Sequence, residues 1–267
     1  MQALTPFIRD QGRGPGVLCL HSNASSSSQW RQLSHLLSDR YRVLAVDGYG
    51  VGQSPEWPVG RAMRLSDEVD LAAPAIALAG DRFHVVGHSY GAAVAVKLAL
   101  VHPARVRSLV LYEPTLFHLV AGADPAASPA AGIWHAANDA ADAVARGDSL
   151  AAAERFIDFW MGPGSWAAMP PARQPAVAGS MRNAKGWRDV TFADNLDLEA
   201  LRTLQVPVLL LWGDRSPESA LSVVRVLQDS LPQLTLAPQP GLGHMGPITD
   251  AQRINQQIAE FIGRNPL

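Results

Sequence analysis

The sequence predicts an α/β protein with a mostly parallel, doubly wound sheet, and two patterns carry this prediction. Short apolar runs rich in Val and Leu recur without polar alternation, as in strands that are buried on both faces. Helical stretches separate most of these runs, and alternating strands and helices favour a parallel sheet covered on both sides. A chain of 267 residues that is 48% hydrophobic and 17% charged can build one such domain.

The strands are expected where the apolar runs lie. We place them at 16–20, 42–46, 83–87, 107–112, 207–212 and 233–237. The whole sheet should contain about seven or eight strands.

Residues 116–200 differ from the rest of the chain. They are rich in Ala, Gly and Pro and contain no obvious strand. Their large aromatic residues are Trp134, Phe156, Phe159, Trp160, Trp166 and Trp187. We expect residues 1–115 and 201–267 to form the core, with 116–200 as a helical insertion between two late strands of the same domain.

Composition excludes several function classes. The formal net charge is -2 without a basic stripe, so no nucleic-acid partner is expected. No segment approaches the roughly 18 uninterrupted apolar residues of a membrane span, and no secretory pattern opens the chain. The single cysteine, Cys19, allows no internal disulfide, so a reducing cytoplasmic location is expected.

Cofactor and metal sites are not expected either. The glycine-rich segment 47–52 is followed by Pro55 rather than by a helix, which excludes a phosphate-binding loop. No cluster of His, Cys, Asp and Glu has the spacing of metal ligands. The expected partner is therefore a small-molecule substrate, and the sequence does not indicate an oligomeric state.

The strongest chemical signal is the pattern Gly-His-Ser-Tyr-Gly at residues 87–91. It follows an expected strand directly and opens an Ala-rich helix, which is the context of a nucleophile elbow. The glycines Gly87 and Gly91 let neighbouring backbone approach, and the helix N-terminus favours negative charge near Ser89. Ser89 is therefore the predicted nucleophile.

A serine hydroxyl at neutral pH needs a base, and His244 is the predicted one. It lies in a loop after the last expected strand and before the final helix, from which an imidazole can reach across the end of the sheet. The other histidines are less well placed. His88, beside the nucleophile, is expected to point into the core.

Together these motifs resemble the α/β-hydrolase family. The similar segments are LCLHSNASSSSQW, VLAVDGYGVGQS, VVGHSYGAA, HPARVRSLVLYEP, VPVLLLWGDRSP and PGLGHMGP, in family order. They cover roughly residues 10–115 and 203–265, and as a set they are highly specific. The resemblance implies the α/β-hydrolase fold, with residues 116–200 in the place of the family's variable helical cap.

The resemblance also implies an oxyanion hole of two backbone N–H groups. One follows the nucleophile, at Tyr90, and the second lies after the first core strand, at Asn23. Ser22 stands where the family usually has glycine. This loop is also similar to that of haloalkane dehalogenases, in which an asparagine side chain faces the active site, so the Asn23 side chain is a further candidate donor.

The third member of the triad departs from the common family pattern. The usual aspartate would lie four residues after Trp212, where this chain has Ser216, which we interpret as a helix N-cap. Glu113, at the end of a core strand, is the preferred acid, because related enzymes carry an acid there and its fixed backbone can aim the carboxylate at His244. Asp214 is the alternative.

The predicted function is hydrolysis of an ester or related carbonyl bond in a small, partly apolar substrate through an acyl-enzyme on Ser89. The same residues could instead support cofactor-free perhydrolysis, acyl transfer, C–C bond hydrolysis or lyase chemistry. A protein that kept the fold as a non-catalytic ligand binder is the alternative from another class.

Overall fold

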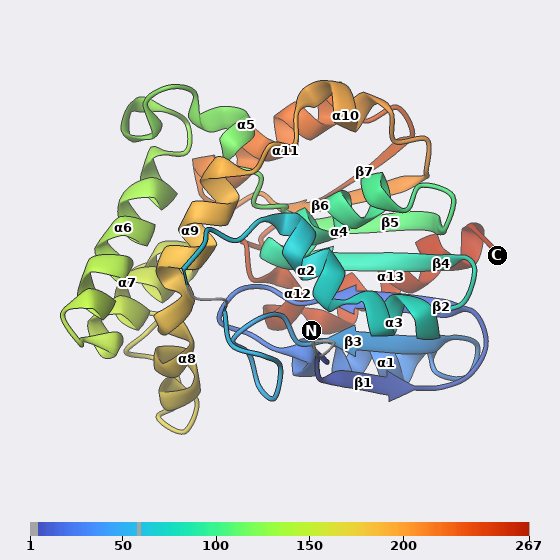
Figure 1. The fold of residues 1–267 in the computed structure, drawn as a ribbon, viewed down its shortest axis with the longest axis horizontal. Helices are drawn as coiled ribbons and strands as arrows, with labels where there is room; N and C mark the ends of the chain where they lie inside the picture. Colours follow the sequence, from blue (N-terminus) through green and yellow to red (C-terminus); the bar gives the residue numbers. More distant parts are fainter. Residues whose placement is uncertain (1–4, 58–59, 267) are drawn as a thin grey trace.

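The computed structural model describes residues 5–57 and 60–266 and confirms the predicted fold class (Figure 1). A seven-stranded sheet has the order β1-β3-β2-β4-β5-β6-β7. β1 is antiparallel to β3, and all other neighbouring strands are parallel. The strands are β1 (Ile8–Gln11), β2 (Gly16–Leu20), β3 (Arg42–Val46), β4 (Phe83–His88), β5 (Val106–Tyr112), β6 (Val208–Gly213) and β7 (Leu234–Gln239).

The strand that the apolar runs do not predict is β1. Its sequence, Ile-Arg-Asp-Gln, is polar and largely exposed. It pairs only with β3, at the edge of the sheet, where exposed backbone and charged side chains replace the buried apolar surface of a central strand. The six predicted strands are all present, with ends shifted by at most two residues.

The two faces of the sheet carry separate apolar clusters. On β2, Val17 and Cys19 pack on the side of α1 (Arg31–Leu37) and α13 (Ala251–Arg264). Leu18 and Leu20 belong to the other cluster, which includes residues of α4 (Tyr90–Val101). Alternate side chains of one strand therefore face opposite helical layers, as the unbroken apolar runs predict.

Helices α2 (Leu65–Leu71), α3 (Ala73–Leu78) and α11 (Glu218–Ser230) contribute to the same cluster as α4. The short 3₁₀ helix η1 (Ser27–Trp30) precedes α1, and α12 (Gly246–Thr249) precedes α13. None of the helices in the described residues is long and apolar enough to cross a membrane.

Between β5 and β6 the described chain is helical and contains no strand. Its elements are α5 (His118–Ala121), η2 (Pro125–Ala127), α6 (Ala131–Ala145), α7 (Ser149–Met161), α8 (Gln174–Ser180), η3 (Met181–Asn183), α9 (Ala184–Ala193) and α10 (Leu198–Arg202). Figure 1 shows α6, α7, α8 and α9 gathered at one end of the sheet. Ser89 and Glu113, which follow parallel strands, lie at the same end of the sheet. Ser89 lines a cavity together with residues of the helical segment, and Glu113 hydrogen-bonds to His244, which lines that cavity too.

Candidate active site

The predicted nucleophile, Ser89, lies on a strained turn between β4 and α4. Ser89 has φ 57° and ψ -117°, a conformation that non-glycine residues rarely adopt. Its carbonyl oxygen accepts hydrogen bonds from the backbone N–H groups of Ala92 (3.0 Å) and Ala93 (3.1 Å), which hold the turn against the first turn of the helix. A Cβ at Gly87 would overlap Ala92, and one at Gly91 would overlap the Leu20 carbonyl, so this turn requires both glycines.

Ser89, His244 and Glu113 form an unbroken hydrogen-bonded chain. Ser89 Oγ lies 2.8 Å from His244 Nε2, and His244 Nδ1 lies 2.6 Å from Glu113 Oε2. A carboxylate only accepts, so Nδ1 carries the proton and Nε2 accepts from the serine hydroxyl. All three side chains are buried. This is the tautomer that a general base for Ser89 requires.

The carboxylate of Glu113 is held by partners on both oxygens. Its Oε1 accepts from Gly213 N (2.7 Å) and from Ser216 Oγ (2.6 Å). The interpretation of Ser216 as an N-cap is therefore wrong: the cap of α11 is Pro217, and the Ser216 hydroxyl binds the acid instead. Asp214 is exposed, and its Oδ1 accepts from Gly241 N (2.8 Å). Glu113, not Asp214, lies in contact with His244.

Backbone strain concentrates at this site. Among residues 5–57 and 60–266, the non-glycine residues with positive φ are Ala24 (56°), Ser89 (57°) and Glu113 (45°). One follows Asn23, and the others belong to the hydrogen-bonded chain. Such conformations cost about 1–3 kcal/mol each and persist where the surrounding structure fixes them, commonly at functional sites.

The two predicted oxyanion donors are free to bind a ligand. In the described chain, the backbone N–H groups of Asn23 and Tyr90 donate to no protein acceptor. Tyr90 is the first residue of α4, where helical N–H groups are unpaired and the dipole favours negative charge. Asn23 lines the same two cavities as Ser89.

A polar network of buried Ser22 and His88 and half-buried Gln29 connects the Asn23 loop with the His244 loop. Ser22 donates to Gln29 Oε1 from its backbone N (3.2 Å) and from its hydroxyl (3.1 Å). Gln29 Nε2 donates to His88 Nδ1 (3.0 Å), and His88 Nε2 donates to the carbonyl oxygen of His244 (2.8 Å). Burial lowers the pKa of His88 well below its usual value, which fits a neutral ring with one donor and one acceptor. As predicted, His88 points into the core.

The main cavity at Ser89 has a volume of about 410 Å³. Ser89, Asn23 and His244 line one side, and α7 and α8 contribute apolar walls that include Ile157 and Met161. Trp160 stacks on the His244 ring, with centroids 3.8 Å apart and planes 22° from parallel. The helical segment thus covers the His244 ring directly and limits water around it.

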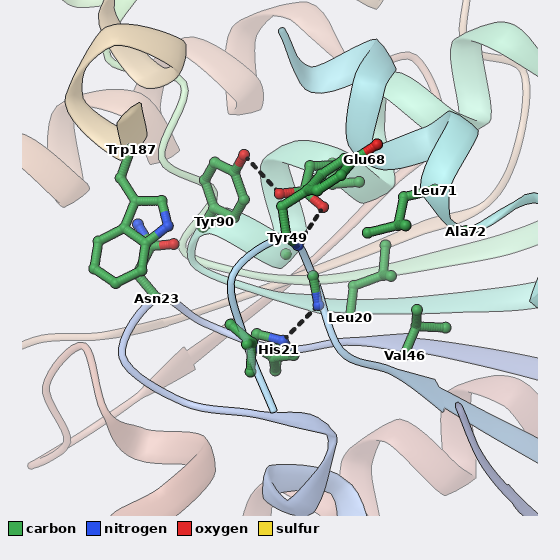
Figure 2. Close-up of a pocket in the computed structure, with 14 residues that line it drawn as sticks. Leu20, His21, Asn23, Val46, Tyr49, Glu68, Leu71, Ala72, Tyr90 and Trp187 are labelled. Carbon is green, nitrogen blue, oxygen red and sulfur yellow. Dashed lines mark hydrogen bonds between the residues drawn. The ribbon is translucent and has the colours of Figure 1, made fainter. Parts of the chain in front are cut away.

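A second cluster of polar residues surrounds the buried carboxyl group of Glu68, next to the Tyr90 hydroxyl (Figure 2). The Tyr90 hydroxyl donates to Glu68 Oε1 (3.2 Å), and Tyr49 N donates to Glu68 Oε2 (3.3 Å). Glu68 is 5% exposed, and burial raises its pKa to about 7. Figure 2 shows these side chains, which line a small cavity together with His21. The volume of this cavity is about 30 Å³.

Sequence reasoning missed Gln29, Glu68 and the binding role of Ser216. One feature of the sequence could have indicated the role of Ser216: a polar side chain stands where the family usually has the catalytic aspartate. Gln29 and Glu68 carry no motif, because their partners lie far away in the sequence.

Comparison with known proteins agrees with this architecture. The model of the alpha/beta hydrolase fold family matches residues 15–251. A pimeloyl-[acyl-carrier protein] methyl ester esterase of Aeromonas hydrophila is 35% identical over 104 residues, 37% of this chain and 37% of the esterase. A provisionally named carbamate hydrolase, RutD of Variovorax paradoxus, is 28% identical over 94% of this chain and 92% of its own.

The matches to curated relatives at 31–36% identity cover only 25–40% of each relative's length. The similarity to these relatives is therefore limited to one part of each protein. Among solved structures, the alpha/beta hydrolase MGS-M2 from a Medee basin deep-sea metagenome superposes with a TM-score of 0.81. It is 16% identical and covers 98% of this chain and 95% of that chain. The family match spans most of the sequence and the fold agrees with it: the chain belongs to the α/β-hydrolase family.

Proposed function

We propose that the protein is a serine hydrolase that cleaves an ester or related carbonyl bond of a small, partly apolar substrate. The observation that carries this proposal is the hydrogen-bonded chain from Ser89 through His244 to Glu113. A free N–H at Asn23 and at Tyr90, beside a cavity of about 410 Å³, supports the same reaction.

In the proposed mechanism, Ser89 Oγ attacks the carbonyl carbon while His244 Nε2 takes the hydroxyl proton. Glu113 stabilises the imidazolium that forms, and the N–H groups of Asn23 and Tyr90 bind the oxyanion. The tetrahedral intermediate collapses, and His244 protonates the leaving group. Water, deprotonated by His244, then attacks the acyl-enzyme and releases the acid and free Ser89.

The helical segment 116–200 is proposed to act as the cap of this site. Trp160 and Met161 of α7 and Met169 line the main cavity, so the segment would shape the substrate volume. The two relatives named above carry esterase and carbamate hydrolase names. Ester and carbamate both present a carbonyl carbon to a nucleophile, and the proposal includes both bond types.

The test is intact-mass labelling with a fluorophosphonate, comparing wild type with Ser89→Ala and His244→Ala. A single adduct on wild type that is absent from both variants is the expected result, because the probe reacts only with an activated serine. A folded wild-type protein that takes up no adduct would make the non-catalytic binding protein the better description. A labelled enzyme would then be assayed with short-chain aryl esters.

A further inference from the structure

Two cavities of very different size meet at Ser89. The larger, about 410 Å³, is lined by Ser89, Asn23 and His244 together with apolar residues of α7 and α8. The smaller, about 20 Å³, is also lined by Ser89 and Asn23, but His244 is not among its lining residues in the described chain. Its other walls come from the start of the helical segment and from α6, α7 and α9, and Phe156 and Trp160 of α7 line both cavities.

The position of His244 distinguishes the two cavities chemically. A carbonyl carbon bonded to Ser89 Oγ has three other substituents: the oxyanion, the leaving group and the acyl chain. The oxyanion would lie at the N–H groups of Asn23 and Tyr90. The leaving group must receive a proton from His244 Nε2, so it belongs in the larger cavity, which His244 lines. The acyl chain then has to occupy the smaller cavity, which Ser89 also lines.

The smaller cavity restricts the acyl chain in size. A volume of about 20 Å³ has room for roughly one or two water-sized groups. Phe117 and Ile133 in its wall are almost fully buried, at 2% and 3% exposure. Phe192 closes another side and contacts the Phe117 ring, with centroids 5.4 Å apart. These packed walls cannot move without loss of core contacts.

The same cavity contains an unsatisfied hydroxyl. Thr115 is 3% exposed, and its Oγ1 has no hydrogen-bond partner in the described chain. Its backbone N donates to the Ser89 carbonyl (3.3 Å), which fixes the residue beside the nucleophile. Thr191, in the same wall, differs because its hydroxyl bonds to its own helix, at Trp187 O (2.9 Å). A buried hydroxyl without a partner is costly unless a ligand satisfies it.

We propose that the small cavity is the acyl subsite and takes a short acyl group with a hydrogen-bonding atom on the carbon next to the carbonyl carbon, as in a 2-hydroxyacetyl ester. Thr115 Oγ1 binds that atom, and the larger cavity takes a bulkier, apolar leaving group. This proposal rests on the serine hydrolase function proposed above and adds the orientation and class of the substrate.

The first experiment varies the two halves of the substrate separately. With 4-nitrophenyl esters, kcat/KM should fall about 100-fold or more from acetate to octanoate, because several methylenes cannot enter the packed cavity. With acetate esters of methanol and of 1-naphthylmethanol, whose alkoxide leaving groups are similarly basic, the larger leaving group should be preferred. The proposal would be overturned if the enzyme accepted long acyl chains and cleaved only esters with a leaving group as small as methanol.

Two variants test the named walls. Phe192→Ala should reduce the acetate-to-octanoate ratio by about tenfold or more, because it enlarges the small cavity. Leu119→Ala, a half-buried apolar residue of α5 that lines neither cavity, is the matched control and should leave the ratio unchanged. An unchanged ratio in a folded Phe192→Ala protein would contradict the subsite.

The hydroxyl is tested with Thr115→Val, which keeps the shape of the side chain. This variant should lose about tenfold in kcat/KM for phenyl 2-hydroxyacetate and change little for phenyl acetate, because only the first substrate offers a partner. Equal losses on both substrates would show a merely structural role. Fluorophosphonate labelling separates the failures: a labelled enzyme with the wrong selectivity overturns this subsite alone, and an unlabelled one that cleaves no ester overturns the proposed function as well.

Discussion

At the residue scale, hydrogen bonds to both oxygens fix the orientation of the Glu113 carboxylate. Its Oε1 accepts from Ser216 Oγ and Gly213 N in the loop after β6, and its Oε2 is left for His244. Ser216 stands in the place of the usual family acid and supplies a donor to an acid on the neighbouring strand. A hydroxyl at position 216 can donate to the Glu113 carboxylate, which follows β5. An aspartate at position 216 would instead place a second negative charge beside Glu113 and repel it.

Glu113→Gln is expected to reduce kcat by roughly 10³–10⁴-fold without unfolding the protein, because an amide cannot stabilise the imidazolium and can favour the wrong tautomer of His244. Steady-state kinetics with an aryl ester measures this loss. Asp214→Asn is the matched control: its oxygen can still accept from Gly241 N, so kcat should stay within about threefold. A larger loss in Asp214→Asn than in Glu113→Gln would reverse the assignment of the acid.

At the element scale, η1 connects the loops that carry the proposed oxyanion donor Asn23 and the proposed base His244. Gln29 in this short helix bonds to Ser22 on one side and to His88 on the other, and His88 bonds to the His244 backbone. Ser22 replaces the family's usual glycine, and its hydroxyl gives Gln29 Oε1 a second donor. The loop can therefore keep its place with a side chain at that position.

Gln29→Leu is expected to lower kcat by about tenfold and the free energy of unfolding by about 1–3 kcal/mol, because the buried side chains of Ser22 and His88 would lose a hydrogen-bond partner. Urea unfolding and kinetics at a temperature where the variant is fully folded measure the two effects separately. Gln32→Leu, an exposed change on the adjoining helix α1, should alter neither. If Gln29→Leu lost stability but kept kcat, the network would support the fold without positioning the catalytic groups.

The elements differ in how far the sequence predicts them. Five strands, β2 to β6, are recognisable as apolar runs because both of their faces are buried. β7 lies at one edge of the sheet and is mostly exposed, so its apolar run reflects less burial than the central runs do. β1, at the other edge, is mostly polar and gives no such run. Ser89 and His244 lie in local motifs. Gln29 and His88 are 59 residues apart, and no local pattern marks a hydrogen bond that only the folded sheet creates. The size of the two cavities likewise depends on side chains of α6, α7, α8 and α9 packing over the sheet.

At the scale of the whole molecule, the proposed function gives the sheet and the helical segment separable tasks. The proposed nucleophile, acid, base and oxyanion donors all follow strands or belong to loops between core elements, whereas most cavity walls come from the segment between β5 and β6. Substitutions in that segment should thus change substrate preference more readily than the chemistry of the triad.

Glu68 makes the stability of the whole molecule depend on pH in a specific sense. Its pKa is about 7 in the folded protein, against 4.5 for the ordinary side chain, because burial penalises the charged form. Between these values the folded protein binds a proton that the unfolded chain does not. The stability contributed by this group is therefore complete below pH 4.5 and is lost as the pH rises through 7.

Glu68→Gln removes this titration while keeping an oxygen that can accept from Tyr49 N. The free energy of unfolding of wild type, minus that of the variant, should fall by up to about 3 kcal/mol between pH 4.5 and pH 8. Urea unfolding of both proteins at the two pH values measures it, and the buried histidines His21 and His88 cancel because both proteins contain them. Asp70→Asn, an exposed carboxylate of the same helix, should keep the wild-type pH dependence. If the difference between wild type and Glu68→Gln is the same at both pH values, Glu68 ionises as easily in the folded protein as in the unfolded chain.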